Sequence, residues 1–473
     1  MKRMSCLKSD NIKELKTMKQ ALIVLIFVTS TAFSQKIQLP ATTQHTLENG
    51  LSVILMEYKK VPVIHFRMVV RGGSALDSTG LDGVAAMATS LMREGTETRT
   101  STDIANAIDF IGGSLSVSAG ADYCAATAEV LKKDLATGLD LFADVILHPS
   151  FPKAEIDRDR KQRLANLEGL KEEPSSVASI VFKKNAYGNH PYGRQSMGTK
   201  ASLDAITRDD LAGFYKTVFI PNNATLVVVG DFASAEMLDK IKATFGTWQK
   251  GEKLDISIAP PTMLQGRRVV LVNKSDATQT QMVFGNTGID IKNPDYFAIQ
   301  VANTIFGSGF TSRLVDELRV KRSLTYGVRS GFSASLYGGT YSISTFTKNA
   351  TVNEMIDAML NEIKKYRANG ATAEELKKGQ NYVAGSFARG LQSPEALAAR
   401  LTDIEIYGFP KNHLETYVQK LKAVTLDDVH RVAQKYFLLD DLLIVLVSPA
   451  EETSPKVKTY GTVNIVELQD AIQ

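Results

Sequence analysis

The sequence predicts an α+β protein of two homologous domains, each an antiparallel sheet packed on one side by helices. One observation is that segments with the alternation of half-buried strands are interspersed with segments of helical periodicity. The other is that the two halves of the chain resemble each other. Residues 209–232 and 426–450 each read as a capped amphipathic helix, an aromatic-rich turn and an apolar strand. A repeat of this length indicates two related domains rather than a solenoid.

The repeat aligns without a gap over its best-matching part. Three pairs, each separated by 218 positions (428 − 210), are Asp210 with Asp428, Phe219 with Phe437, and Val229 with Val447. A second similarity pairs "AEIDRDRKQRLANL" from Ala154 with "AEELKKGQNYVAGS" from Ala373. We therefore expect the same sequence of elements in both halves.

The elements of the first half follow from local pattern. An extended segment over residues 45–58 turns at Asn49-Gly50, and the alternation from His65 to Val70 favours a half-buried strand. Residues 112–131 resemble a hairpin. Helical patterns cover residues 83–93, 101–111, 133–147 and 153–172. These assignments predict an N-terminal domain over 39–250, a linker over 251–265, a C-terminal domain over 266–450, and a tail over 451–473.

Composition excludes two classes of protein. The chain has 473 residues, of which 44% are hydrophobic and 22% charged, with a formal net charge of +4. That is too apolar for a disordered chain and too weakly charged for a dedicated nucleic-acid binder. No nucleic-acid partner is expected.

Residues 1–34 have the pattern of a secretory signal peptide. A basic start precedes an apolar run from Ala21 to Phe33 and a small-x-small end before Gln35, and Met18 is an alternative start of translation. The run is short for a bilayer span, so we expect export, most readily to a periplasm, with no stable span after cleavage; an uncleaved anchor is the alternative. Cleavage would leave Cys124 alone, which excludes an internal disulfide.

Several motifs in a fixed order carry a family resemblance. They are "LENGLSVIL", "RGGSALDSTG", "REGTETRT", "ILHPSFPKAEIDRDR", the "HPYGRQSMGTK" segment with its continuation to "VVVGDF", and "GSGFTSRLVDELRVKRSLTYGV". The chain resembles the insulinase/pitrilysin metallopeptidases from about Leu39 to Pro449. Within that family it is most similar to the short two-domain type that includes mitochondrial processing peptidase.

The resemblance implies that the zinc site of the family is degenerate here. Family members bind zinc through His-x-x-Glu-His on one helix, with the Glu as general base, and through a later Glu. Counting back from Gly95-Thr96 places the three positions of the motif on Ala86, Thr89 and Ser90. Alignment from "EIDRDR" places the later ligand on Asn166. The six histidines of the chain offer no replacement pair on one helix face. We expect no metal and no other cofactor in this chain.

The C-terminal half keeps the other part of the family chemistry. In "RVKRSLTY", Arg319 and Tyr326 match an Arg-Tyr pair that the resemblance identifies as substrate and oxyanion contacts. A surface Arg with a core Tyr is the alternative interpretation. Gly307 and Gly309 match a glycine-bearing loop that lines the substrate chamber in the family, although a plain turn explains them equally well.

Loss of the ligands with retention of the pair suggests a shared active site. We expect the chain to be inactive alone and to pair with a homologous zinc-bearing subunit as a heterodimer. The partner would carry the zinc, and Arg319 and Tyr326 would act on a peptide substrate in trans. Two alternatives stay open. One is a non-catalytic binding or scaffolding protein on a peptidase fold, and the other is a peptidase active alone through an unrecognised metal site.

Overall fold

A computed structural model describes residues 39–472 of the chain, and the segment from Pro40 onward forms one compact unit. The predicted signal peptide, Met18 and the first cysteine lie outside the described residues. Among residues 39–472, no helix is both long enough and apolar enough to cross a membrane.

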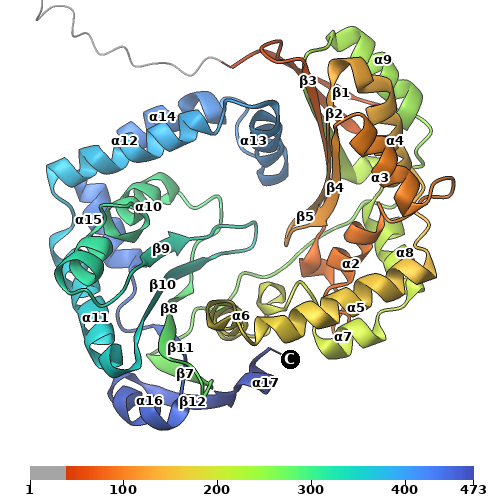
Figure 1. Ribbon diagram of the computed structural model, residues 1–473. Coiled ribbons are helices and arrows are strands. Elements are labelled where there is room, and N and C mark those ends of the chain that lie inside the picture. The colour runs from red at the N-terminus through yellow and green to blue at the C-terminus, as the bar shows by residue number, and fades with distance from the viewer. Residues whose placement is uncertain (1–38, 473) are drawn as a thin grey trace, which may run out of the picture. The chain divides into compact units, whose positions relative to one another are not determined.

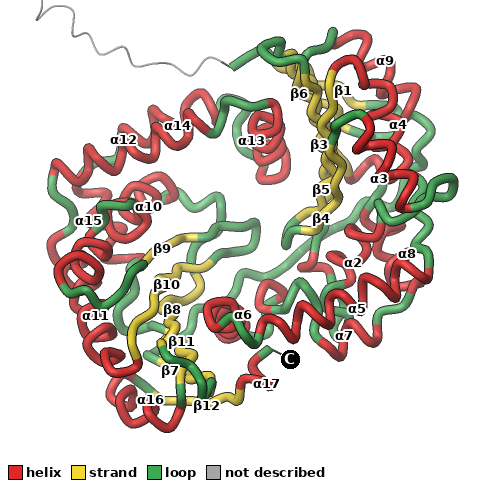
Figure 2. Tube along the Cα trace, viewed as in Figure 1, coloured by secondary structure: helices red, strands yellow, loops and turns green. Residues whose placement is uncertain are grey.

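Within residues 39–472, the first half contains six strands and the second half another six, and helices lie between the strands of each half (Figures 1 and 2). The elements of the first half are β1 (Thr42–Thr46), β2 (Ser52–Glu57), β3 (Val63–Arg71), α2 (Val84–Leu91), α3 (Ser101–Phe110), β4 (Ser114–Ala119), β5 (Tyr123–Leu131), α4 (Leu135–Leu147), α5 (Lys153–Leu170), α6 (Pro174–Tyr187), α7 (Lys200–Ala205), α8 (Arg208–Val218), β6 (Ala224–Gly230) and α9 (Ser234–Phe245).

The elements of the second half are β7 (Arg268–Asn273), β8 (Gln279–Thr287), α10 (Tyr296–Asn303), β9 (Val328–Phe332), β10 (Thr340–Lys348), α11 (Val352–Asn369), α12 (Ala373–Arg389), α13 (Pro394–Tyr407), α14 (His413–Lys422), α15 (Leu426–Tyr436), β11 (Leu443–Ser448), α16 (Ala450–Val457), β12 (Thr462–Glu467) and α17 (Leu468–Ala471). Residues 251–265, the expected linker, contain neither helix nor strand.

The two sheets confirm the duplication. Their strand orders are β1-β2-β6-β3-β5-β4 and β12-β7-β11-β8-β10-β9, so five strands correspond one to one. The sheets are mixed rather than wholly antiparallel, which corrects the expectation: β2 runs parallel to β6, and β7 runs parallel to β11. These pairs join strands from opposite ends of each half, and such long-range pairing leaves no local pattern in the sequence.

The outermost strand distinguishes the halves. In the first sheet β1 pairs antiparallel with β2, whereas in the second sheet β12 pairs parallel with β7. The segment expected to be a C-terminal tail therefore supplies an edge strand, and Val457 and Tyr460 just before it are buried. These buried apolar side chains explain why residues 450–471 are ordered against the sheet.

The repeated helices begin in the same way. Thr207 caps α8 and Thr425 caps α15. Each threonine hydroxyl accepts a hydrogen bond from the backbone N–H of the Asp three residues later, and the carboxylate of that Asp accepts one from the backbone N–H of the threonine. Such capping boxes satisfy helix N–H groups that would otherwise lack partners. The repeat seen in the sequence is thus a repeat of local structure.

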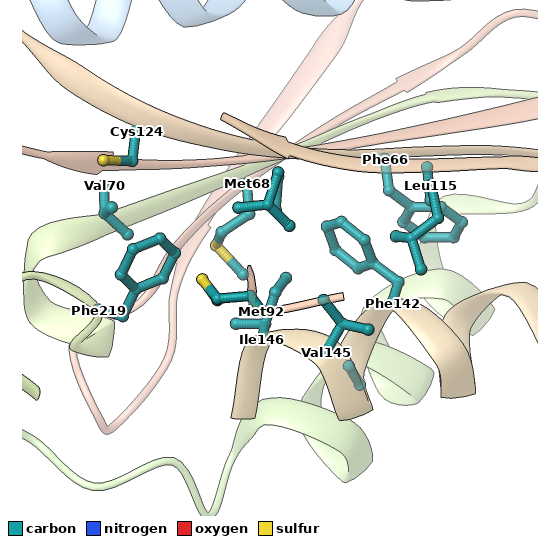
Figure 3. Packing of buried hydrophobic residues seen from close by; sticks show 14 of the residues in the cluster. Phe66, Met68, Val70, Met92, Leu115, Cys124, Phe142, Val145, Ile146 and Phe219 are labelled. Carbon is teal, nitrogen blue, oxygen red and sulfur yellow. The ribbon is translucent and has the colours of Figure 1, made fainter. Parts of the chain in front are cut away.

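The first hydrophobic core lies between one face of the first sheet and its helices. Figure 3 shows Phe66 and Met68 of β3 facing Phe142 and Ile146 of α4, and all four side chains are almost fully buried. A second core of the same kind fills the space between the second sheet and its helices.

The two halves exchange a helix across their sheets (Figure 1). Helix α6, from the first half, packs on β8 and β11 of the second sheet, with Val181 and Phe182 buried there. Helix α13, from the second half, packs on β3 and β6 of the first sheet, with Ile406 against Val69. The expectation of helices on one side only is therefore incomplete, since each sheet also receives a helix from the other half.

Candidate functional site

Helix α2 carries the positions that resemble the zinc helix, and its N-terminus is built by two residues. Gly83 precedes it with φ +95°, and a Cβ there would lie 2.7 Å from the backbone nitrogen of Gly198. The buried carboxylate of Asp77 accepts hydrogen bonds from the N–H groups of Gly83 at 2.7 Å and Ala85 at 3.1 Å. Burial raises the pKa of Asp77 to about 7, although both hydrogen bonds oppose the rise.

The polar side chains of α2 are satisfied within the helix itself. Thr89 is completely buried, and its hydroxyl donates to the carbonyl oxygen of Ala85 at 2.8 Å. Ser90 donates to the carbonyl oxygen of Met87 at 3.0 Å. Ala86 offers only a methyl group. None of the three therefore projects a free ligand atom.

Arg163 of α5 lies against these positions. Its Nη2 donates to the Ser90 hydroxyl at 2.8 Å and to the Ala86 carbonyl oxygen at 3.2 Å, while its Nε donates to Asp159 at 2.5 Å. Its side chain is only 14% exposed. A fixed positive charge thus sits at the two positions that would carry the histidine ligands.

Asn166, the expected position of the third ligand, does not share the contact with Arg163 that Ala86 and Ser90 make. It is exposed and accepts a hydrogen bond from Gln162 at 2.9 Å. The α5 residues that hydrogen-bond to α2 are Asp159 and Arg163. Sequence reasoning missed them, although an acid and an arginine four residues apart on a helix indicate an ion pair on one face.

Arg319 and Tyr326 of the second half do come together. The guanidinium carbon of Arg319 lies 4.8 Å from the centre of the Tyr326 ring and 5.8 Å from that of Phe310. Tyr326 is 77% exposed and Phe310 76% exposed, so the alternative of a core Tyr is wrong. Within residues 39–472, Arg319 has no carboxylate within ion-pair distance and the Tyr326 hydroxyl has no hydrogen bond.

The backbone around this pair is irregular. Residues Thr304–Ser308 and Val315–Lys321 form π-helical turns, and Ser323 has a left-handed φ of 54°. Single π turns and left-handed non-glycine residues are uncommon and gather at functional sites. The helical segment ends before Tyr326, so the turn at Ser323, not a shared helix face, brings the pair together.

The two glycines have separate environments. A Cβ on Gly307 would lie 2.4 Å from the Ser330 hydroxyl and 2.7 Å from Leu314, so close packing requires a glycine there. Gly309 instead lines an open pocket of about 410 Å³ beside α12. No hydrogen bond or ion pair among the described residues joins either glycine or Arg319 to the α2–α5 cluster.

Comparison with known families identifies the chain. The model of the insulinase (M16) peptidase family matches residues 53–200, and that of the peptidase M16 inactive domain matches residues 205–383. The chain belongs to the insulinase family of peptidases. These two matches follow one another along the duplicated fold.

Relatives of this M16 chain include two bacterial proteins described as uncharacterized zinc proteases. The one from Streptomyces coelicolor is 25% identical over 82% of this chain and 86% of its own length. The one from Bacillus subtilis, YmxG, is 22% identical over 86% of this chain and 98% of its own length.

Two solved structures share the fold of this chain. A crystal structure of a peptidase M16 inactive domain from Pseudomonas fluorescens has a TM-score of 0.81, with 27% identity over 86% of this chain and 98% of that chain. A protease from Helicobacter pylori has a TM-score of 0.79 at 22% identity over 87% of this chain and 100% of that chain, which supports the fold alone.

Zinc, which the family name implies, does not fit the residues present in this M16 chain. A zinc site needs three or four converging N, S or O ligands. The α2 positions offer a methyl group and two hydroxyls already bonded to carbonyl oxygens, and Arg163 adds a positive charge. Among residues 39–472, no group of three His, Cys, Asp or Glu side chains is placed to hold a metal ion.

Proposed function

We propose that this M16 chain is the non-zinc subunit of a heterodimeric peptidase. One observation carries the proposal: Arg163 fills the degenerate ligand positions, while among the described residues the half-buried Arg319 has no carboxylate partner and the exposed Tyr326 has no partner for its hydroxyl. Polar groups without such partners in an irregular segment of backbone are available to a ligand. The zinc, its water and the general base would belong to a homologous partner subunit.

The pair is suited to a peptide substrate. A guanidinium and a phenol hydroxyl both donate hydrogen bonds to a carbonyl oxygen, and both interactions strengthen when that oxygen becomes an oxyanion. Contact with the Tyr326 ring holds the Arg319 guanidinium without neutralising it. The pair therefore binds the carbonyl and stabilises the charge that develops there.

The compartment is part of the proposal. Residues 1–34 have the basic start, short apolar run and small-residue end of a signal peptide. Export to a periplasm would place the heterodimer among unfolded or imported peptides. Mass spectrometry of the secreted N-terminus tests this, since cleavage leaves a chain that begins at Gln35.

A native pull-down tests the pairing. The tagged chain is purified from its own cells, and every co-purifying chain is sequenced. We expect a stoichiometric companion that contains His-x-x-Glu-His, with zinc and peptidase activity only in the pair. A homodimer or an unrelated companion without zinc or activity would leave a binding or scaffolding role instead.

Variants of the pair test the residue roles. In the assembled heterodimer, Arg319→Ala and Tyr326→Phe should each lower kcat about a hundredfold to a thousandfold, the effect of removing one oxyanion donor. Zinc content and subunit stoichiometry should stay unchanged, because neither residue is proposed as a metal ligand. Arg329→Ala, an exposed arginine on β9, is the matched control. Full activity in both pair variants would reject the catalytic role.

A further inference from the structure

Phe310 is an exposed aromatic residue that the proposed function does not yet use. It is 76% exposed, in the short segment between the two π-helical turns, and it lines a pocket together with residues of α12. Its ring centre lies 5.8 Å from the Arg319 guanidinium carbon. Val320 and Tyr382, which share pocket linings with Phe310, are exposed as well. Exposed apolar side chains that gather in one patch mark interaction sites.

Two pockets meet at Phe310. The Arg319 pocket, of about 480 Å³, is lined by Phe310, Thr311, Arg313, Val315, Asp316, Arg319, Val320 and Glu375. The Tyr382 pocket, of about 410 Å³, is lined by Thr304, Ile305, Gly309, Phe310, Thr311, Glu375, Lys378, Gly379, Asn381 and Tyr382. Both volumes are typical of ligand sites. Phe310 belongs to both linings, so its ring stands at the boundary between them.

The charges around the pockets are largely neutralised by one another. Arg313 makes a bidentate ion pair with Glu375, both bonds 2.7 Å long, and Lys378 pairs with Glu374 at 2.8 Å. A charged ligand side chain would have to compete with these pairs. The exposed lining that carries no charge includes Val320, 66% exposed, and Tyr382, 51% exposed, beside the polar Thr311 and Asn381. Arg319, half-buried, is the one cation of these linings without a carboxylate partner.

We infer that Phe310 sets a preference for extended peptides with two bulky apolar side chains, one in each pocket. The peptide backbone crosses the Phe310 ring between the pockets and turns a carbonyl oxygen toward Arg319. Phe310 is then a specificity-determining residue, and Arg319 is indifferent to side chains because it contacts backbone. This inference rests on the proposed function, since it names the peptide class that the same site accepts.

Binding of two defined probes to the full chain tests the inference without a partner. Both are fluorescent peptides of equal length and charge; one carries Leu and Phe near its centre, and the other carries Ala at both places. Fluorescence anisotropy should show the Leu/Phe peptide binding about tenfold tighter, the effect of burying roughly half of each bulky side chain.

Three variants separate the roles. Phe310→Ala should reduce the tenfold preference to less than about twofold while leaving affinity for the Ala peptide unchanged. Arg319→Ala should weaken both peptides equally and keep the preference. Phe110→Ala removes a phenylalanine that is 90% exposed in the first half, and this matched control should change neither quantity. Circular dichroism melting confirms that each variant is folded.

The outcomes distinguish this inference from the proposed function. If Arg319→Ala weakens binding but the wild-type chain shows no apolar preference, or Phe310→Ala retains it, the pocket assignment is overturned alone. If Arg319→Ala has no effect on either peptide and the native pull-down yields no zinc subunit, the proposed function fails as well. A tenfold preference abolished only by Phe310→Ala supports the inference.

Discussion

Arg163 offers the sharpest test of why this chain is expected to hold no metal. Two ligand-restored chains would carry Ala86→His, Thr89→Glu, Ser90→His and Asn166→Glu. One keeps Arg163, and the other also carries Arg163→Leu. If the missing ligands alone prevent zinc binding, both ligand-restored chains should bind zinc. If the guanidinium of Arg163 also prevents it, only the chain with Arg163→Leu should bind zinc.

The contact distances give the size of the effect. Nη2 of Arg163 lies 2.8 Å from the Ser90 hydroxyl, so a metal bound by a histidine at that position would lie about 4 Å from the guanidinium. Charges of +1 and +2 at about 4 Å repel by about 8 kcal/mol at an effective dielectric constant of about 20. Even a guanidinium displaced to about 8 Å would repel by about 4 kcal/mol.

That repulsion is large beside the binding energy available. Structural zinc sites gain about 10–16 kcal/mol, and a loss of about 4 kcal/mol weakens binding about a thousandfold. We therefore expect the chain with Arg163 to bind zinc at least about a thousandfold more weakly than the chain with leucine.

Zinc content at a buffered nanomolar concentration of free metal, measured by plasma mass spectrometry, gives the comparison. The expected result is about one zinc per chain with leucine, as in a complete site, and almost none with Arg163. The matched control replaces Arg158 with leucine, since that arginine shares α5 but is 63% exposed and pairs with Glu94. Equal zinc in the two Arg163 backgrounds, or no zinc in either, would refute the electrostatic reasoning.

Three further predictions concern stability, measured as urea midpoints. Burial raises the pKa of Asp77 in the folded chain to about 7, above its value in the unfolded chain, so the folded chain binds more protons between these two pH values. The free energy of unfolding should therefore fall by up to about 4 kcal/mol from pH 4 to pH 7 and then level off. Asp77→Asn should abolish this part of the pH dependence. Phe182 lies on α6, the first-half helix that packs on the second sheet, and Phe182→Ala should lower the free energy of unfolding by about 3–5 kcal/mol. Phe110→Ala, at an exposed position, should change it by less than about 0.5 kcal/mol. Gly307→Ala should cost about 1–3 kcal/mol, because its methyl group would meet the Ser330 hydroxyl.

The fold was predictable where its cause is local. The repeat at Asp210 and Asp428 encodes a capping box in each half, and the structure has both. Parallel pairing of β2 with β6 was not predictable, because the two strands are separated by the rest of the half. The packing of α6 and α13, each on the sheet of the other half, was not predictable either. An apolar face shows that a helix is buried, but it does not show against which sheet.

The same division applies to the candidate site. The Gly-Thr frame located Ala86, Thr89 and Ser90 on one helix, as α2 confirms. The contact from Arg163 was missed because it spans 73 positions of the chain. For Arg319 and Tyr326, the resemblance predicted a pair that contacts one substrate, and the two side chains do lie together. The structure adds that the left-handed Ser323 makes their contact possible.

Helix α2 can lack zinc ligands and still support the fold, because its core-facing side chains and the ligand positions Ala86 and Ser90 lie on different faces of the helix. Val84, Met87 and Leu91 are almost fully buried in the first core. Ala86 and Ser90 lie on the half-exposed face toward α5, where a change of side chain creates no cavity in that core. The buried Thr89 is the exception, and its hydroxyl bonds to the carbonyl oxygen of Ala85. Arg163 of α5 donates to the Ser90 hydroxyl and the Ala86 carbonyl oxygen, so α2 and α5 stay joined at these positions.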